Sequence, residues 1–148
     1  MYIERKQDLS VYYFIKTLYN DAPFIKIVDD FPENLLTIPT IAVEADTIIT
    51  MPYEMGNRDR MQLRTWYFDF FTENKAQRDE YGYRLLNALE QPIPVYDYDL
   101  GFPPAVVARL GAFNVDELQL SPIAVIPSES EKLYYRAVLK YVSSYNPC

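Results

Sequence analysis

The chain has 148 residues, of which 49% are apolar and 24% charged, enough apolar side chains to bury a core in one domain. Lys and Arg number 14 against 21 Asp and Glu, which gives a net charge of -7. This balance disfavours tight nucleic-acid binding, because such proteins neutralise phosphates with clustered basic residues. No apolar run approaches the roughly 18 residues of a membrane helix. We therefore expect one soluble domain over residues 1–148.

The first predicted element is an amphipathic helix. Four apolar residues recur at the spacing of one helical face: Val11, Phe14, Ile15 and Leu18. Asp8 or Ser10 is placed to cap the start of this helix, and Pro23 ends it. The apolar stripe predicts that the helix packs against a sheet.

Two strands and a long connection are predicted next. The stretch "FIKIV" favours a short strand, and Ile41, Val43 and Ala45 alternate with less apolar residues, as in a half-buried strand. Met51 to Arg60 is polar and rich in turn formers, which predicts the connection of a long hairpin.

The stretch "RTWYFDFFTENKAQRDE" marks the passage from a strand to a helix. Residues 61–72 carry large side chains on both alternation sets, which predicts a central strand covered on both faces. Asn74, with Gln77 three residues later, predicts the start of a helix over residues 75–90. Gly82 would let that helix approach the sheet closely.

The last third of the chain favours strands. The stretch "IPVYDYDLGFPP" predicts a short strand followed by a Gly-Pro turn cluster, and alternation around 118–125 and over 132–145 predicts two more strands. The order of elements predicts an α+β fold, in which two helices pack on one face of a mainly antiparallel sheet.

Catalytic and metal-binding signatures are scarce. There is no histidine, and the single cysteine is Cys148, which removes the commonest general base and the usual zinc ligands. The four glycines are isolated, so no phosphate-binding loop can form. We expect no enzyme activity, no cofactor and no metal site.

Three carboxylates keep a chemical alternative open. Asp97 and Asp99 in "YDYD" would lie on one side of a strand and form the pocket of a small hydrolase, with or without Glu54, although a turn-forming role is the simpler interpretation. Asp69 lies among aromatic residues and would need a partner, for which Arg64 and Arg84 are candidates.

The aromatic content is the main positive signal. Fourteen Tyr, eight Phe and one Trp exceed what one small core encloses, and Tyr is suited to protein interfaces. Scattered exposed tyrosines without a function are the alternative.

An ordered set of segments carries a resemblance to a known family: "FPENLLTIPTIAVEADTI", "YEMGNRD", "WYFDFFTENKAQRDEYGYRLLNALE", "IPVYDYDLGFPP" and "YYRAVLKYVSSY". Together they resemble the tail-terminator or tail-completion proteins of long-tailed bacteriophages, over about residues 30 to 145. The order of helices and strands agrees with the one predicted above. The resemblance includes no catalytic motif.

This resemblance implies a virion protein assembled in the host cytoplasm. Such proteins form a ring, typically hexameric, that caps the tail tube and joins it to the neck or head-completion proteins, and DNA passes through without specific binding. Residues 51–60 would be a hairpin arm and the Phe102 loop a second contact. The implied interface residues are Tyr53, Glu54, Met55, Arg58, Arg60 and Phe102.

Other functions remain open on this sequence. A neighbouring neck, head-completion or baseplate protein would fit the same segments. A small monomeric module that binds peptide or sugar would need an exposed tyrosine groove.

Overall fold

The computed structural model of the protein describes residues 2–21, 25–28, 39–52, 60–99, 108–123 and 135–147. Within them, helix α1 spans Ile3–Leu18 and helix α2 spans Lys75–Ala88. The strands are β1 (Lys26–Val28), β2 (Thr40–Pro52), β3 (Arg60–Thr72), β4 (Ile93–Tyr96), β5 (Arg109–Ile123) and β6 (Tyr135–Pro147). Neither helix is long and apolar enough to cross a membrane.

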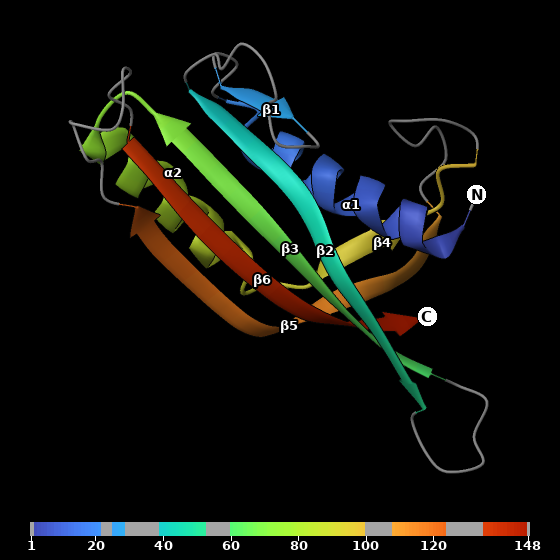
Figure 1. The fold of residues 1–148 in the computed structure, drawn as a ribbon. Coiled ribbons are helices and arrows are strands. Elements are labelled where there is room, and N and C mark those ends of the chain that lie inside the picture. Colours follow the sequence, from blue (N-terminus) through green and yellow to red (C-terminus); the bar gives the residue numbers. More distant parts are fainter. Residues whose placement is uncertain are drawn as a thin grey trace.

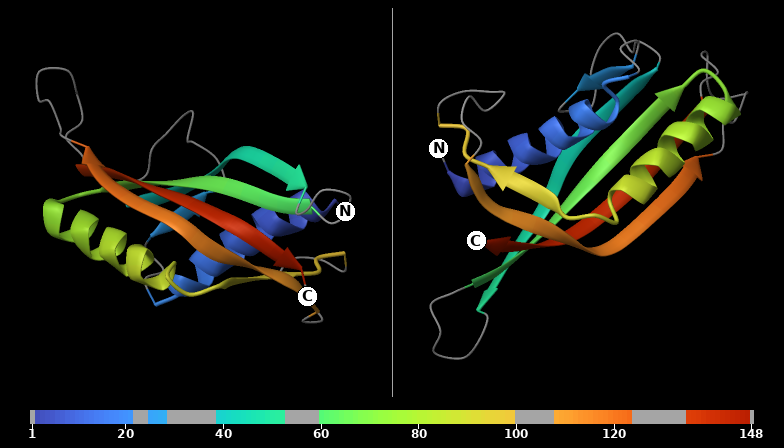
Figure 2. Two further views of the ribbon diagram at one scale, coloured as in Figure 1. Left: turned by 90° about the horizontal axis from the view of Figure 1, so that it is seen from below. Right: turned by 180° about the vertical axis from the view of Figure 1, so that it is seen from behind.

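The strands form one curled sheet in the order β1-β2-β3-β6-β5-β4. Only β1 and β2 pair in parallel, and all other neighbours are antiparallel. Both helices lie on the same face of this sheet, as Figure 1 and the view from below in Figure 2 show. The predicted α+β class, with a mainly antiparallel sheet and two helices on one face, is confirmed.

The core fills the space between the helices and the sheet. Trp66, Phe68 and Phe70 alternate along β3, the third strand in the sheet order, and all three are buried. They pack in one cluster with apolar residues of both helices and of the neighbouring strands, including Val11, Ile15, Leu85, Phe113, Leu139 and Tyr141. The sequence therefore correctly predicted β3 as a central strand. The predicted cover on both faces is confirmed only near its end, because on the face away from the helices Phe71 is buried but Thr65 and Tyr67 are half-buried.

The prediction for the start of α1 is wrong. The helix begins at Ile3, one turn or more before Asp8 and Ser10, and Tyr2 occupies the N-cap position without a side-chain cap. From inside the helix, the Asp8 side chain accepts a hydrogen bond from Arg64, and the Ser10 hydroxyl accepts one from the Tyr96 backbone N–H. Asp8 and Ser10 are capping residue types, but they do not mark the helix start because distant partners bind their side chains.

The predicted start of α2 is confirmed. Asn74 is the N-cap, and its side-chain oxygen accepts a hydrogen bond from the Gln77 backbone N–H at 2.8 Å. The Gln77 side chain accepts in turn from the Glu73 backbone N–H at 2.9 Å, a variant of the capping box. The helix ends at Ala88, two residues before the predicted end.

Gly82 lets α2 approach the sheet, as predicted. A Cβ atom at this position would lie 3.2 Å from Cδ2 of Leu120 in β5. This close approach sets the separation between α2 and the outer part of β5.

Candidate interaction surface

The residues predicted to form an interface fall mostly on parts of the chain that the structure does not describe. Tyr53, Glu54, Met55, Arg58 and Phe102 lie outside the described residues. Arg60 is the first residue of β3, where its backbone lies opposite Pro52. The long hairpin predicted around residues 51–60 is confirmed by this pairing of β2 with β3.

The paired strands of this hairpin form an arm, defined here as residues 46–52 and 60–64. The arm projects past the rest of the sheet in Figure 1. It begins at an irregularity in β2 between Ala45 and Ile48, where the register with β3 shifts. Ile48 and Ile49 follow the irregularity and are 42% and 47% exposed. Two adjacent exposed isoleucines on opposite faces of one strand favour a contact surface on the arm.

Besides the outermost strands β1 and β4, two longer stretches of strand have no neighbour on one side among the described residues. β1 pairs with β2 only up to Ala42, so β2 is open from Val43 onward. β4 pairs with β5 only up to Phe113, so β5 is open beyond that point. These open edges lie on opposite sides of the sheet, because β2 and β5 are separated by β3 and β6.

A groove of about 360 Å³ lies beside the open edge of β5. Tyr83 and Leu86 of α2 form one wall, and Leu118, Leu120 and Pro122 of β5 form the other. Tyr83 is 53% exposed, one of the few large hydrophobic side chains in the described residues that is so accessible. In the right view of Figure 2, α2 lies along the sheet beside β5. Most of the lining residues are apolar, and Arg78 and Asp79 are the charged ones.

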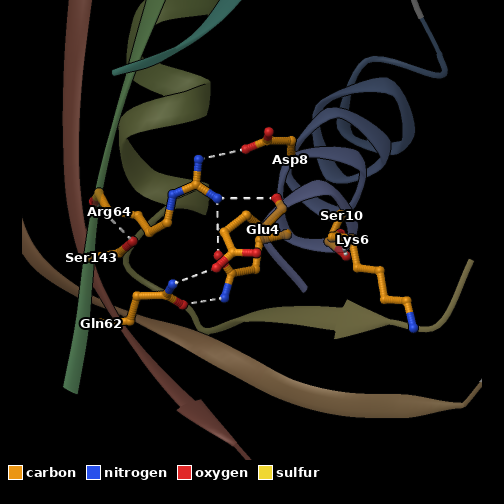
Figure 3. A network of polar contacts seen from close by, with 8 residues as sticks. Glu4, Lys6, Asp8, Ser10, Gln62, Arg64 and Ser143 are labelled. Carbon is orange, nitrogen blue, oxygen red and sulfur yellow. Dashed lines mark hydrogen bonds and ion pairs between the residues drawn. The ribbon is translucent and has the colours of Figure 1, made fainter. Parts of the chain in front are cut away.

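A buried arginine ties α1 to the base of the arm (Figure 3). Arg64 in β3 is 1% exposed. Its Nη1 donates to the Glu4 carbonyl at 3.1 Å and to Gln7 Oε1 at 2.9 Å, and its Nη2 donates to Asp8 Oδ1 at 2.7 Å. The guanidinium also lies over the Trp66 ring, 4.7 Å from its centroid. A buried charge is tolerable here because most of its donors are satisfied.

Other polar side chains extend this network. Gln7 Nε2 donates to Gln62 Oε1 at 2.7 Å, and Ser143 in β6 donates to the Arg64 carbonyl at 3.3 Å. The N-terminal half of α1 is thus held to β3 by polar contacts, whereas Val11 and Ile15 hold the other half by apolar packing. This network was not predicted from the sequence. Its signal was an arginine in the alternation set of Trp66, Phe68 and Phe70.

The Asp97 and Asp99 carboxylates are ion-paired. Lys6 Nζ lies 3.0 Å from Asp97 Oδ1 and 3.1 Å from Asp99 Oδ2. The Asp99 backbone N–H donates to Asp97 Oδ1 at 3.0 Å, and this bond, followed by the Lys6 bond, lowers the pKa of Asp97. The same two carboxylates, Asp97 first, raise the pKa of Lys6. Glu54, the third group of the alternative hydrolase pocket, lies outside the described residues.

The predicted partner of Asp69 is wrong. Asp69 is 5% exposed and accepts from Arg136 Nη2 in β6 at 2.9 Å, not from Arg64 or Arg84. Arg84 Nη2 donates instead to Asp21 Oδ1 and to the Leu18 carbonyl, each at 2.7 Å. Asp69 and Arg136 meet because both project from the face of the sheet opposite the helices, as a diagonal pair: Arg136 lies two residues from Val138, the register partner of Asp69.

The described residues offer no group of three or more Asp, Glu, His or Cys side chains suited to a metal ion. Their accessible features are open strand edges, an apolar groove and a projecting arm, which are all suited to binding another polypeptide. No protein-family model matches the chain, and no curated protein matches it.

Proposed function

We propose that this protein is a structural protein of a bacteriophage virion. In this proposal it forms a ring, typically hexameric, at the head–tail junction, caps the tail tube and joins it to the neck or head-completion proteins. The proposal combines the segment resemblance described above with one observation, the two open edges on opposite sides of a single sheet.

This observation bears on assembly because a closed ring needs two different patches that meet head to tail. The open stretch of β2 and the open stretch of β5 are different in sequence and lie on opposite sides of each copy. An isologous dimer would instead use one self-complementary patch and stop at two copies. The arrangement of the edges therefore supports a ring over a dimer.

The charge of the chain supports the same role. A net charge of -7 would let a ring surround DNA without gripping the phosphate backbone. The arm projects past the sheet in Figure 1, where it could reach the tail tube or a neighbouring copy. Localisation in the virion, at the junction of tail and head, belongs to this proposal.

A second candidate rests on the groove between α2 and β5. Its volume of about 360 Å³ and its exposed Tyr83 would suit a monomeric module that binds a peptide. Such a module would stay monomeric at every concentration, whereas the ring would not.

The test is the mass of the purified protein by light scattering over a concentration series, with negative-stain imaging of the same samples. We expect closed rings, alone or after addition of purified tail tubes. Charge reversal at Arg58 and Arg60 should weaken assembly while the circular dichroism spectrum stays unchanged, because Arg60 belongs to the arm and Arg58 lies in the sequence between its two strands. Reversal at Arg5, exposed on α1, is the control.

A monomer that binds no tail tube would overturn the ring proposal and favour the peptide-binding module. If rings form normally when the charge of both arginines is reversed, the ring proposal stands, but these two arginines do not belong to the interface between copies.

A further inference from the structure

We propose that the groove between α2 and β5 of one copy receives the segment Glu44–Ile49 of β2 from the next copy. This inference rests on the head-to-tail ring of the proposed function. It specifies the two surfaces that meet, which the ring proposal by itself leaves open.

The exposed apolar side chains support this pairing. Ile48 and Ile49 on β2 are large, exposed hydrophobic residues, and Tyr83 at the groove is another. They lie on opposite sides of one copy, so neither set can cover the other within the same chain. A second copy brings the two sets together. Ile48 would then become buried and fill apolar space beside Leu118 and Leu120.

Strand direction supports it as well. β2 is antiparallel to β3, β3 to β6 and β6 to β5, so β2 and β5 run in opposite directions. A rotation about an axis along the strands keeps these directions. β5 of one copy would therefore meet β2 of the next in an antiparallel pair, the arrangement of most of this sheet.

The faces of the sheet also match. Ile48 pairs with Arg64, whose side chain lies on the face that carries the helices. Leu118 pairs with Tyr141, which pairs with Trp66 on that same face. If β2 of the next copy continues the sheet, its Ile48 falls on the groove side, next to Leu118 and Leu120.

Charge complementarity points to the same orientation. Asp46 is exposed and precedes Ile48, so antiparallel pairing carries it toward Pro122, which lines the groove together with Arg78. α2 begins at Lys75, has no acidic residue in its first turn, and presents the positive end of its dipole there. Lys75 is exposed and makes no ion pair with the described residues. An acidic strand segment from the next copy would complement the charge at this end of α2.

The open edge of β5 is suited to a short, specific pairing. A register shift between Val115 and Glu117 interrupts it at one end, and Pro122, which has no N–H to donate, limits it at the other. Such features protect edges from indiscriminate strand addition. The next copy would thus contribute a few backbone hydrogen bonds, and the groove would supply the specificity.

Cysteine cross-linking tests the contact in the full-length protein. In a Cys148→Ser background, one sample carries Ile48→Cys and a second carries Tyr83→Cys, and each is treated with a short bismaleimide. We expect cross-linked dimers only when the two samples are mixed, because the contact joins two different surfaces. A mixture of Ile48→Cys with Tyr2→Cys is the matched control, since Tyr2 is 86% exposed on a different element.

A charge exchange provides an independent measurement. Asp46→Lys or Lys75→Glu alone should raise the dissociation constant between copies about three- to tenfold, and the double variant should restore it to within about twofold. Neither residue is buried, so the fold should tolerate all three variants.

The outcomes separate the two proposals. Rings that form without cross-linking between positions 48 and 83, and without rescue by the double variant, overturn this contact and leave the ring standing. Protein that never self-associates, with or without tail tubes, overturns both.

Discussion

Arg64 is the residue on which the attachment of α1 to the sheet depends. It lies in a strand whose other helix-facing residues include Trp66, Phe68 and Phe70. Its guanidinium donates hydrogen bonds to Glu4, Gln7 and Asp8, which all belong to α1. Burial of an unpaired guanidinium would be very costly, so these partners explain how the strand tolerates it. Its stacking on Trp66 adds packing to the polar contacts.

Replacement of Arg64 tests this role. We expect Arg64→Ala to lower the free energy of unfolding by about 3 kcal/mol, because it removes the network and leaves a cavity. Arg64→Met, which retains most of the volume, should cost about half as much. Urea unfolding followed by tryptophan fluorescence measures both. As the control, Arg5→Ala on the exposed face of α1 should change stability by less than about 0.5 kcal/mol. If Arg64→Ala cost no more than this control, the assigned role of Arg64 would be contradicted.

At the scale of elements, α2 shows how local sequence and tertiary contact combine. The pair Asn74 and Gln77 determines where the helix starts, and Gly82 determines how near it lies to β5. The groove proposed as an interface is lined on its α2 side by residues before and after Gly82, among them Asp79, Tyr83 and Leu86.

Substitution of Gly82 should separate helix propensity from packing. Gly82→Ala gains up to about 1 kcal/mol of helix propensity, and we expect a net stabilisation of about 0.5 kcal/mol because the nearby Leu120 methyl group must shift slightly. Gly82→Val should instead destabilise by about 1 kcal/mol through overpacking. Urea unfolding of both variants, with Ala76→Gly in the exposed first turn as the propensity control, provides the test. Stabilisation by valine would contradict the close approach.

At the scale of the whole molecule, acidic residues stabilise the fold through contacts between distant segments. The Lys6 pairs with Asp97 and Asp99 join α1 to the end of β4, and Arg84 with Asp21 joins α2 to the segment after α1. In the folded chain the pKa of Asp97 is lowered, chiefly by the Asp99 backbone N–H, and that of Asp21 chiefly by the Arg84 side chain. Their contribution to stability is therefore present above the ordinary pKa of aspartate.

Stability should consequently fall in acid. As the pH falls below about 4 and through the lowered pKa values, protonation removes these contributions, because the unfolded chain binds protons more readily than the folded one. We expect Asp21→Asn with Asp97→Asn to flatten this dependence. Unfolding by urea at a series of pH values from 6 to about 3 measures the slope. The same steep loss in the double variant would show that other groups govern the acid sensitivity.

The elements were predictable because their signals are local. Asn74 and Gln77 are three residues apart, the aromatic alternation of β3 fits in one strand, and turn formers mark the hairpin. The prediction failed where a side chain has a distant partner. Asp8 and Ser10 are residue types that commonly cap helices, but both lie inside α1, where they contact Arg64 and Tyr96.

The sequence by itself determined the α+β class, the central strand, the start of α2 and the hairpin, because hydrophobic period and capping act within a few residues. Only the tertiary structure decided which arginine pairs with Asp69, which strand edges stay open and where the groove lies. Those depend on the order β1-β2-β3-β6-β5-β4, which brings together residues far apart in the chain. Strand order arises from the packing of the whole sheet around its helices, and no local pattern encodes it.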